Sequence, residues 1–287
     1  MQYVDVMKRI QRIRLRTNKM LCGVGIGSFA TRRIGDGFEF EQLRDYQVGD
    51  NVRAIDWKSS ARHNKLIVRS YREDQNRSIL LLIDISSSTK FGSASLLAES
   101  VIKDVGIMLC CMAENGRDRI GALFFHDTIA QVVPFGVGRL HSAMLAQAIC
   151  AAQATGKGTS IDQVYAAVLE RCKKNTCVVL ISDCLGEGYE KLMTLVAKRH
   201  ELMVLRVYDG IVRDFPHQLL VACQDPETGL TVDCTDPASM AAMRAFMAQW
   251  YQRQTILFRK SGIRYCDLNV RESYEKVLVP FFTQSCL

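Results

Sequence analysis

The residues best suited to chemistry in this chain follow a short apolar stretch. Five apolar residues, Ile79 to Ile83, lead directly into Asp84, and serines stand at positions 86, 87 and 88. An Ile- and Leu-rich run of this kind is typical of a strand buried on both faces of a parallel sheet. Open α/β sheets bind ligands where such strands end and a helix follows. Asp84-x-Ser86-x-Ser88 offers only hard oxygen donors, which suit Mg²⁺ or Mn²⁺ better than zinc.

Two further stretches could bring oxygen donors to the same place. Thr159 lies in Gly156-Lys-Gly-Thr-Ser160, and Asp183 follows the apolar run 176–181. Because the carboxyl ends of neighbouring parallel strands lie side by side, we expect both residues near Asp84. Two carboxylates and three hydroxyls, completed by water, could form an octahedral shell around Mg²⁺ or Mn²⁺.

A simpler interpretation assigns each of these side chains a local role. Ser86 and Ser88 would cap the following helix, Thr159 would cap its own helix, and Asp183 would be a turn residue. Any one of the features alone favours this interpretation. Their expected convergence at one edge of the sheet favours the metal site.

The elements that must position these residues alternate regularly from residue 78 onward. Strands are predicted at 78–84, 118–126, 129–134, 176–183, 201–209 and 263–268. Helices are predicted at 93–114, 139–152, 160–172, before residue 200, at 237–260 and at 272–284. This alternation predicts a doubly wound α/β domain with a mostly parallel sheet over residues 78–287. Short strands around Asp225-Pro-Glu-Thr-Gly229 predict a hairpin insertion near residues 210–236.

Residues 1–77 differ in character from the rest of the chain. They hold 16 Lys and Arg against 9 Asp and Glu, whereas the remainder is neutral. Residues 1–20 have the spacing of an amphipathic helix, and short strand-like segments follow at 38–40 and 65–71. We therefore expect a separate basic segment containing short strands. Its charge suggests an acidic protein partner, an anionic surface or nucleic acid, or else a solvated face without a partner.

The composition excludes several classes of protein. Nearly half of the 287 residues are hydrophobic, and no apolar run is long enough to span a bilayer. The short apolar stretch after residue 20 is broken by glycines and followed by no cleavage site, which argues against a signal peptide. Eleven cysteines without paired spacing indicate reduced, mostly buried thiols in a cytoplasmic protein.

Two alternative functions deserve a comparison with the metal site. Asp84 could be the nucleophile of a phosphoryl-transfer enzyme, but Ser86 stands where a second carboxylate would act as acid and base. The sequence contains no GxSxG, HExxH or correctly spaced phosphate-binding loop. The basic residues of segment 1–77 could contact nucleic-acid phosphates, although few aromatic residues accompany them for base stacking.

Asp84-x-Ser86-x-Ser88, Thr159 and Asp183 resemble the metal-ion-dependent adhesion site of von Willebrand factor type A domains. The order of strands and helices over residues 78–287 is also similar to that family. The resemblance implies a bound metal that keeps one coordination position open for a carboxylate of a partner protein. It thus implies a non-enzymatic module that presents Mg²⁺ or Mn²⁺ to an exposed Asp or Glu.

The upstream segment extends the resemblance. Gly37-Phe-Glu-Phe40, Leu43-Arg-Asp-Tyr46, Arg53-Ala-Ile-Asp-Trp57 and Ser60-Ala-Arg62 resemble the bacterial family called domain of unknown function 58. That family joins such a segment to a von Willebrand factor type A domain. Its members are often encoded beside MoxR-type AAA+ ATPases, which implies an ATPase partner in chaperone-like assembly. Many members carry N-terminal membrane helices, and none is expected here.

Trp57 could belong to an exposed recognition surface, together with three nearby arginines: Arg44, Arg53 and Arg62. The sequence favours an intramolecular alternative, because tryptophan is usually largely buried. In that alternative Trp57 packs onto the α/β domain, and the arginines pair with Asp45, Asp50 and Asp56.

Overall fold

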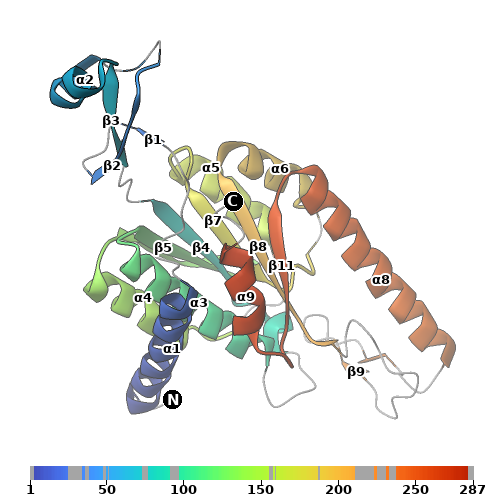
Figure 1. The fold of residues 1–287 in the computed structure, drawn as a ribbon. Coiled ribbons are helices and arrows are strands. Elements are labelled where there is room, and N and C mark those ends of the chain that lie inside the picture. Colours follow the sequence, from blue (N-terminus) through green and yellow to red (C-terminus); the bar gives the residue numbers. More distant parts are fainter. Residues whose placement is uncertain are drawn as a thin grey trace. The chain divides into compact units, whose positions relative to one another are not determined.

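The computed structural model describes residues 3–24, 34–35, 39–47, 50, 52–72, 77–90, 97–154, 158, 160–186, 188–210, 223–224, 231–232 and 237–283. The chain divides into two compact units. The larger, an α/β unit, lies within Met1–Phe29 and Arg77–Gln284. The smaller lies mainly within Ala30–Asn76. Figure 1 shows the elements of both.

A six-stranded sheet forms the centre of the α/β unit. Its strands are β4 (Ser78–Asp84), β5 (Arg119–Phe125), β6 (Ile129–Gly136), β7 (Cys177–Ser182), β8 (Glu201–Tyr208) and β11 (Arg264–Asn269). They lie in the order β11-β8-β7-β4-β5-β6, and every pair is parallel except β5 with β6. This confirms the predicted doubly wound, mostly parallel α/β fold, the class that the resemblance to von Willebrand factor type A domains implied.

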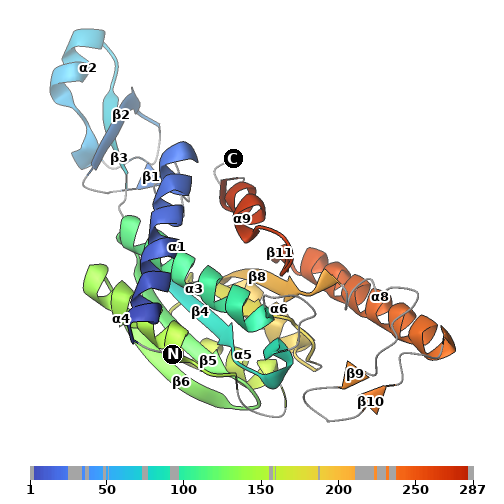
Figure 2. The same ribbon diagram turned by 90° about the horizontal axis from the view of Figure 1, so that it is seen from below.

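Helices cover both faces of this sheet (Figures 1 and 2). Helices α1 (Tyr3–Val24), α3 (Ala98–Asn115), α4 (Arg139–Ala151) and α9 (Tyr274–Thr283) lie on one face. Helices α5 (Ile161–Arg171), α6 (Glu190–Arg199) and α8 (Pro237–Lys260) lie on the other. Because alternate side chains of a strand point to opposite faces, Leu81 and Leu82 of β4 enter different cores. The continuous apolar run of β4 reflects burial on both faces.

Helix α1 belongs to the α/β unit, which differs from the predicted division at residue 77. The predicted amphipathic helix is present, and its buried Val6 and Ile13 join the core formed with α3 and α9. The periodicity of α1 indicates an apolar face but carries no information about which element that face contacts. The predicted segment 1–77 is therefore split, with only its second part in the smaller unit.

The smaller unit contains the short strands that the sequence predicts. Strands β1 (Ile34–Gly35), β2 (Glu39–Asp45) and β3 (Ile67–Arg72) form an antiparallel sheet in the order β1-β3-β2. Between β2 and β3 lie a 3₁₀ turn, η1 (Val52–Ala54), and helix α2 (Trp57–His63). Asp56 caps α2, because its side chain accepts hydrogen bonds from the backbone N–H groups of Lys58 and Ser59.

Two short strands lie within the predicted hairpin insertion near residues 210–236. Strands β9 (Cys223–Gln224) and β10 (Thr231–Val232) pair antiparallel, and most of the remaining insertion lies outside the described residues. The helix predicted at 93–114 begins later than expected, because α3 starts at Ala98. Ser87–Lys90 forms a separate 3₁₀ turn, η2.

Candidate metal centre

The candidate site lies where the strand order reverses. Strand β4 pairs with β5 on one side and with β7 on the other, both in parallel. Asp84 is the last residue of β4, and Asp183 directly follows the last residue of β7. Ligands bind open α/β sheets outside the carboxyl ends of the strands at such a switch point. The fold thus places both predicted carboxylates at this position.

Asp84 is buried and held from two sides. Its side chain is 1% exposed. One carboxylate oxygen, Oδ1, accepts a hydrogen bond from the backbone N–H of Ser86 at 2.9 Å. The other, Oδ2, accepts from the hydroxyl of Ser182 at 2.5 Å. Ser182 thus joins the ends of β4 and β7 through side chains as well as through the sheet.

A second set of contacts links the loop after β4 to Asp183. The hydroxyl oxygens of Ser86 and Ser88 lie 2.8 Å apart, and the Ser88 hydroxyl is close enough to the Asp183 carboxyl group to lower its pKa. Asp183 Oδ1 also accepts from the backbone N–H of Leu185 at 3.1 Å. Asp84, Ser86, Ser88 and Asp183 therefore form one connected cluster.

Thr159 lies outside the described residues, but its neighbour is placed. The backbone N–H of Ser160 donates to the carbonyl of His126 at 2.8 Å. His126 follows β5, which pairs directly with β4. The start of α5 is thus anchored beside the end of a strand that neighbours Asp84.

The local interpretation of the serines as helix caps does not fit these contacts. The N-cap of α3 is Leu97, without a side-chain cap, so neither Ser86 nor Ser88 caps α3. Instead the Ser86 carbonyl accepts from both the backbone N–H and the hydroxyl of Thr89 inside η2. The N-cap of α5 is Ser160.

The carboxyl groups of Asp84 and Asp183 are both buried, so their negative charges are poorly hydrated and repel each other. Loss of hydration, followed by the negative charge of Asp183, raises the pKa of Asp84 to about 7. Burial likewise raises the pKa of Asp183, while the hydrogen bond from Ser88 opposes that shift. Two buried acids in one site are stabilised either by protons or by a cation. The donor set of carboxylates and hydroxyls suits a hard divalent cation.

The site has fewer strong ligands than most protein metal sites. In the part of the chain that the structure describes, no group of three or more His, Cys, Asp or Glu residues gathers in a way that could hold a metal. A cation bound by Asp84 and Asp183 would therefore depend on hydroxyls and water for its remaining ligands. This fits Mg²⁺, which usually keeps several waters and binds through one or two carboxylates.

The predicted recognition surface is partly exposed. Trp57 is 65% exposed, contrary to the expectation that it packs onto the α/β domain. Arg62 is also exposed, whereas Arg44 donates to both carboxylate oxygens of Asp50 at 2.8 and 2.6 Å. The side chain of Arg53 lies outside the described part of the structure. Average burial is thus a poor guide to a single tryptophan at the start of a short helix.

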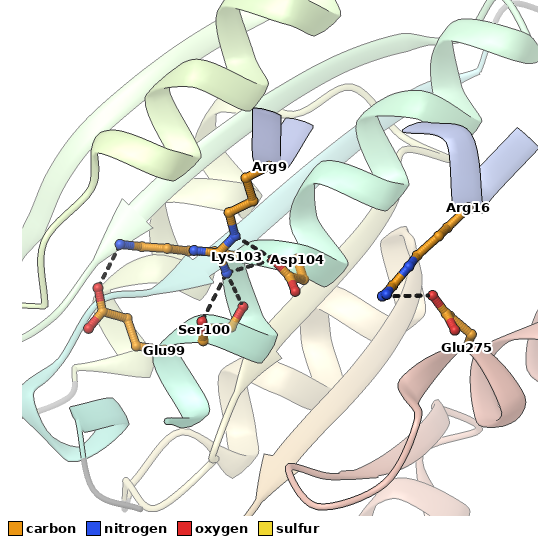
Figure 3. A network of polar contacts seen from close by, with 7 residues as sticks. All are labelled: Arg9, Arg16, Glu99, Ser100, Lys103, Asp104 and Glu275. Carbon is orange, nitrogen blue, oxygen red and sulfur yellow. Dashed lines mark hydrogen bonds and ion pairs between the residues drawn. The ribbon is translucent and has the colours of Figure 1, made fainter. Parts of the chain in front are cut away.

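The basic residues of α1 attach this helix to the rest of the α/β unit (Figure 3). Arg9 donates to the Asp104 carboxylate at 2.7 Å and to the Ser100 carbonyl at 2.8 Å, both on α3. Arg16 points toward Glu275 on α9, with 3.5 Å between the charged atoms. Arg14 pairs with Glu114. Three of the basic side chains that suggested an acidic partner or nucleic acid, Arg9, Arg14 and Arg16, are therefore engaged in ion pairs within the unit.

Two buried polar residues near the site were missed by sequence reasoning. Arg206 and Gln254 are 1% and 5% exposed, and they contact each other beside the loop that carries Asp183. A single arginine in the apolar strand 201–208 was a visible signal that something polar must accompany it. Gln254 carried no such signal, because glutamine is common on exposed helix faces.

Among the described helices, none is both long enough and apolar enough to cross a bilayer.

Comparison with known proteins identifies relatives without an assigned function. The uncharacterized protein Rv1480 of Mycobacterium tuberculosis (strain H37Rv) is 28% identical over 233 residues, covering 80% of this chain and 74% of the relative. The uncharacterized protein YeaD of Bacillus subtilis (strain 168) is 33% identical over 63 residues, covering 22% of this chain and 16% of the relative.

Two solved structures are similar to this chain at TM-scores below 0.5. The conserved hypothetical protein BatB from Bacteroides thetaiotaomicron has a TM-score of 0.47 and 14% identity, covering 73% of this chain and 98% of that chain. The VWA domain of SpRpn10 has a TM-score of 0.39 and 10% identity, covering 72% and 94%. Likenesses at this level do not define a shared site.

The family model described as "Protein of unknown function DUF58" matches residues 42–256. The match includes β4, β7 and the loops that carry Asp84 and Asp183, together with most of the smaller unit. Because it spans well over half of the chain, the chain belongs to the DUF58 family.

Proposed function

We propose that this protein is a metal-dependent protein-binding module. Asp84, Ser86, Ser88, Thr159 and Asp183 would hold Mg²⁺ or Mn²⁺ directly or through water. The observation that carries the proposal is the meeting of two buried carboxyl groups, Asp84 and Asp183, whose pKa values are both raised. A divalent cation would neutralise the repulsion between the two carboxylates, and the surrounding hydroxyls are hard oxygen donors that could coordinate it.

The donor set also supports an open coordination position. Hydroxyls and water are weaker ligands for Mg²⁺ than a carboxylate is, so an Asp or Glu of a partner would be a favourable further ligand. The chain's own residues orient the site: Ser182 holds one oxygen of Asp84, and the Leu185 amide holds one oxygen of Asp183. The remaining carboxylate lone pairs are then directed by the fold rather than by the ligand.

The surroundings of Asp84 support a non-enzymatic role. A carboxylate that attacks phosphorus must be ionised and accessible. Asp84 is buried, both of its oxygens accept hydrogen bonds, and its pKa of about 7 leaves it partly protonated at neutral pH. Each of these features lowers its reactivity as a nucleophile.

We further propose that the partner is a cytoplasmic MoxR-type AAA+ ATPase with an exposed acidic side chain, as the family resemblance implies. The smaller unit would supply a second contact surface. On α2 and the turn after it, exposed Trp57 lies among exposed basic side chains that would complement an acidic protein: Lys58, Arg62 and Lys65. An exposed aromatic residue beside basic residues is typical of interface hot spots.

Capture of partners from cytoplasmic extract tests this proposal. Wild-type protein, Asp84→Ala and the control Glu170→Ala would each be used with Mg²⁺ and with EDTA. Glu170 is exposed on α5, so its replacement removes a carboxylate away from the proposed ligands. We expect a partner that wild type and the control retain only with Mg²⁺, and that Asp84→Ala does not retain. Equal retention by all three proteins in EDTA would contradict the proposal.

A further inference from the structure

A row of polar side chains extends from the candidate site across the sheet. Ser182 of β7, Arg206 of β8 and Asp267 of β11 are partners in register at the same level of three neighbouring strands. Ser182 donates to Asp84, and Arg206 donates to both carboxylate oxygens of Asp267 at 2.8 and 2.9 Å. A buried charge of this kind needs a complete set of partners. Here the last partner comes from α8.

Helix α8 encloses Arg206 with three residues of one face. Gln254 accepts a hydrogen bond from Arg206 Nη1 at 2.9 Å. The rings of Tyr251 and Phe258 have their centroids 4.7 and 5.7 Å from the guanidinium carbon. Residues spaced by three and four positions share a helix face, so α8 is held in one rotation about its axis. Gln254 is thereby fixed in place.

The orientation of the Gln254 amide follows from the chemistry of its neighbour. Arginine has only donors, so the amide oxygen of Gln254 must face Arg206. The amide nitrogen then points the other way, where it donates to the Cys184 carbonyl and, at 2.9 Å, to the Tyr189 hydroxyl. All hydrogen-bonding positions of the Gln254 amide group except one oxygen lone pair are thus in use.

The Cys184 carbonyl belongs to the same peptide group as the Leu185 N–H, and that N–H donates to Asp183 Oδ1. Because a peptide group is planar and trans, its oxygen and hydrogen point in opposite directions. A hydrogen bond that fixes the Cys184 carbonyl oxygen therefore also fixes the direction of the Leu185 N–H. The need for such a donor is evident at Cys184 itself, whose φ of 59° lies in the left-handed region that non-glycine residues rarely adopt.

From these contacts we infer that Gln254 is a positioning residue for the candidate metal centre. It fixes the Cys184–Leu185 peptide group and, through the Leu185 N–H, the carboxylate of Asp183. The inference deepens the proposed function and depends on it for its relevance to metal binding. It assigns α8, whose sequence gave no indication of a role, to the support of a proposed ligand.

The sharpest variant is Gln254→Glu, with Gln252→Glu as its matched control. A glutamate at position 254 still accepts from Arg206 but cannot donate to Cys184 when ionised. Gln252 is exposed on the same helix, so its replacement makes the same change in charge elsewhere. A second variant, Gln254→Met, removes the donor without adding charge. Near-ultraviolet circular dichroism would show which variants retain native packing.

Two measurements distinguish the inference from the proposed function. The first is hydrogen exchange of the Leu185 amide in metal-free protein, which we expect to accelerate at least about tenfold in both Gln254 variants and not in the control. The second is Mg²⁺ affinity, which we expect to fall by about 10- to 100-fold, as is usual when a residue that orients a metal ligand is lost.

Unchanged Leu185 exchange in a folded Gln254 variant would overturn the inference, whatever the Mg²⁺ result. If wild type binds no Mg²⁺ while Leu185 exchange still depends on Gln254, the positioning role is upheld and the metal function fails. If Leu185 exchange accelerates but wild type and variant bind Mg²⁺ equally, the contact orients the loop without serving the metal, and the inference is overturned.

Discussion

Replacing Asp183 by asparagine should make the metal-free protein more stable at neutral pH, although the residue is a proposed ligand. Asparagine keeps Oδ1 as the acceptor for the Leu185 N–H. Its amide nitrogen can donate to the Ser88 hydroxyl, which can then turn its own proton toward Ser86, 2.8 Å away between oxygens. The variant thus removes a charge while it preserves the local hydrogen bonds.

The size of the effect follows from the pKa of Asp84. A pKa of about 7, against a usual value of 3.8, means that ionising Asp84 costs about 4 kcal/mol more in the folded protein than in the unfolded chain. Burial is the largest cause of the rise and the charge of Asp183 the second. Removal of that charge should recover part of this cost, on the order of 1–2 kcal/mol.

The sign of the pH dependence is also determined. Carboxyl groups with raised pKa values hold protons more tightly in the folded state than in the unfolded state. Their contribution to stability is therefore complete below the usual pKa of 3.8 and is lost as the pH rises toward 7. The advantage of Asp183→Asn over wild type should be small at pH 4–5 and largest at pH 8.

Urea unfolding followed by circular dichroism, in EDTA at pH 5 and pH 8, measures this difference. Exposed Glu170, changed to Gln, is the control and should shift stability by less than about 0.5 kcal/mol. A metal-free Asp183→Asn protein that is less stable than wild type at pH 8 would refute the reasoning, because it would show that the two carboxyl groups are not in conflict.

Three further predictions concern metal, partner and helix α1. Saturating Mg²⁺ should raise the melting temperature of wild type more at pH 7.5 than at pH 5.5, because protons compete with the metal for Asp84 and Asp183 at the lower pH. Scanning calorimetry measures this difference, and an equal rise at both pH values would contradict it. Trp57→Ala should reduce partner capture at least about tenfold and leave Mg²⁺ affinity unchanged, because Trp57 is exposed in the smaller unit. A change in Mg²⁺ affinity would show that the substitution acts on more than the surface around Trp57. Arg9→Ala should destabilise the α/β unit by about 1–3 kcal/mol, because partly buried Asp104 loses the Arg9 guanidinium. An unchanged free energy of unfolding in urea would mean that the Arg9–Asp104 ion pair does not stabilise the unit.

Much of the fold could be predicted because its signals are local. The strand predicted at 78–84 coincides with β4, and the alternation of strands and helices indicated the class of sheet. The meeting of Asp84 with Asp183 could also be expected, because the ends of neighbouring parallel strands must lie at one edge. These expectations needed only the period of each element and the general rule for where such sheets place their loops.

The remaining features depend on contacts between residues far apart in the sequence. The periodicity of α1 could not show that Arg9 and Arg16 would pair with α3 and α9. Gln254 looks like a surface residue until Arg206, 48 positions away, is placed beside it. Trp57 was expected to be buried because tryptophan usually is, whereas at the start of the short helix α2 its side chain is exposed.

Calorimetric titration of the metal-stripped protein with Mg²⁺ at pH 7 tests the central claim most directly. Two buffers with different heats of ionisation would report proton release as well as affinity. We expect saturable binding with release of protons, because Asp84 is partly protonated at this pH, and we expect Asp84→Asn to lose both signals. Wild-type protein that gives no saturable heat, or an Asp84→Asn protein that titrates as wild type does, would contradict the account.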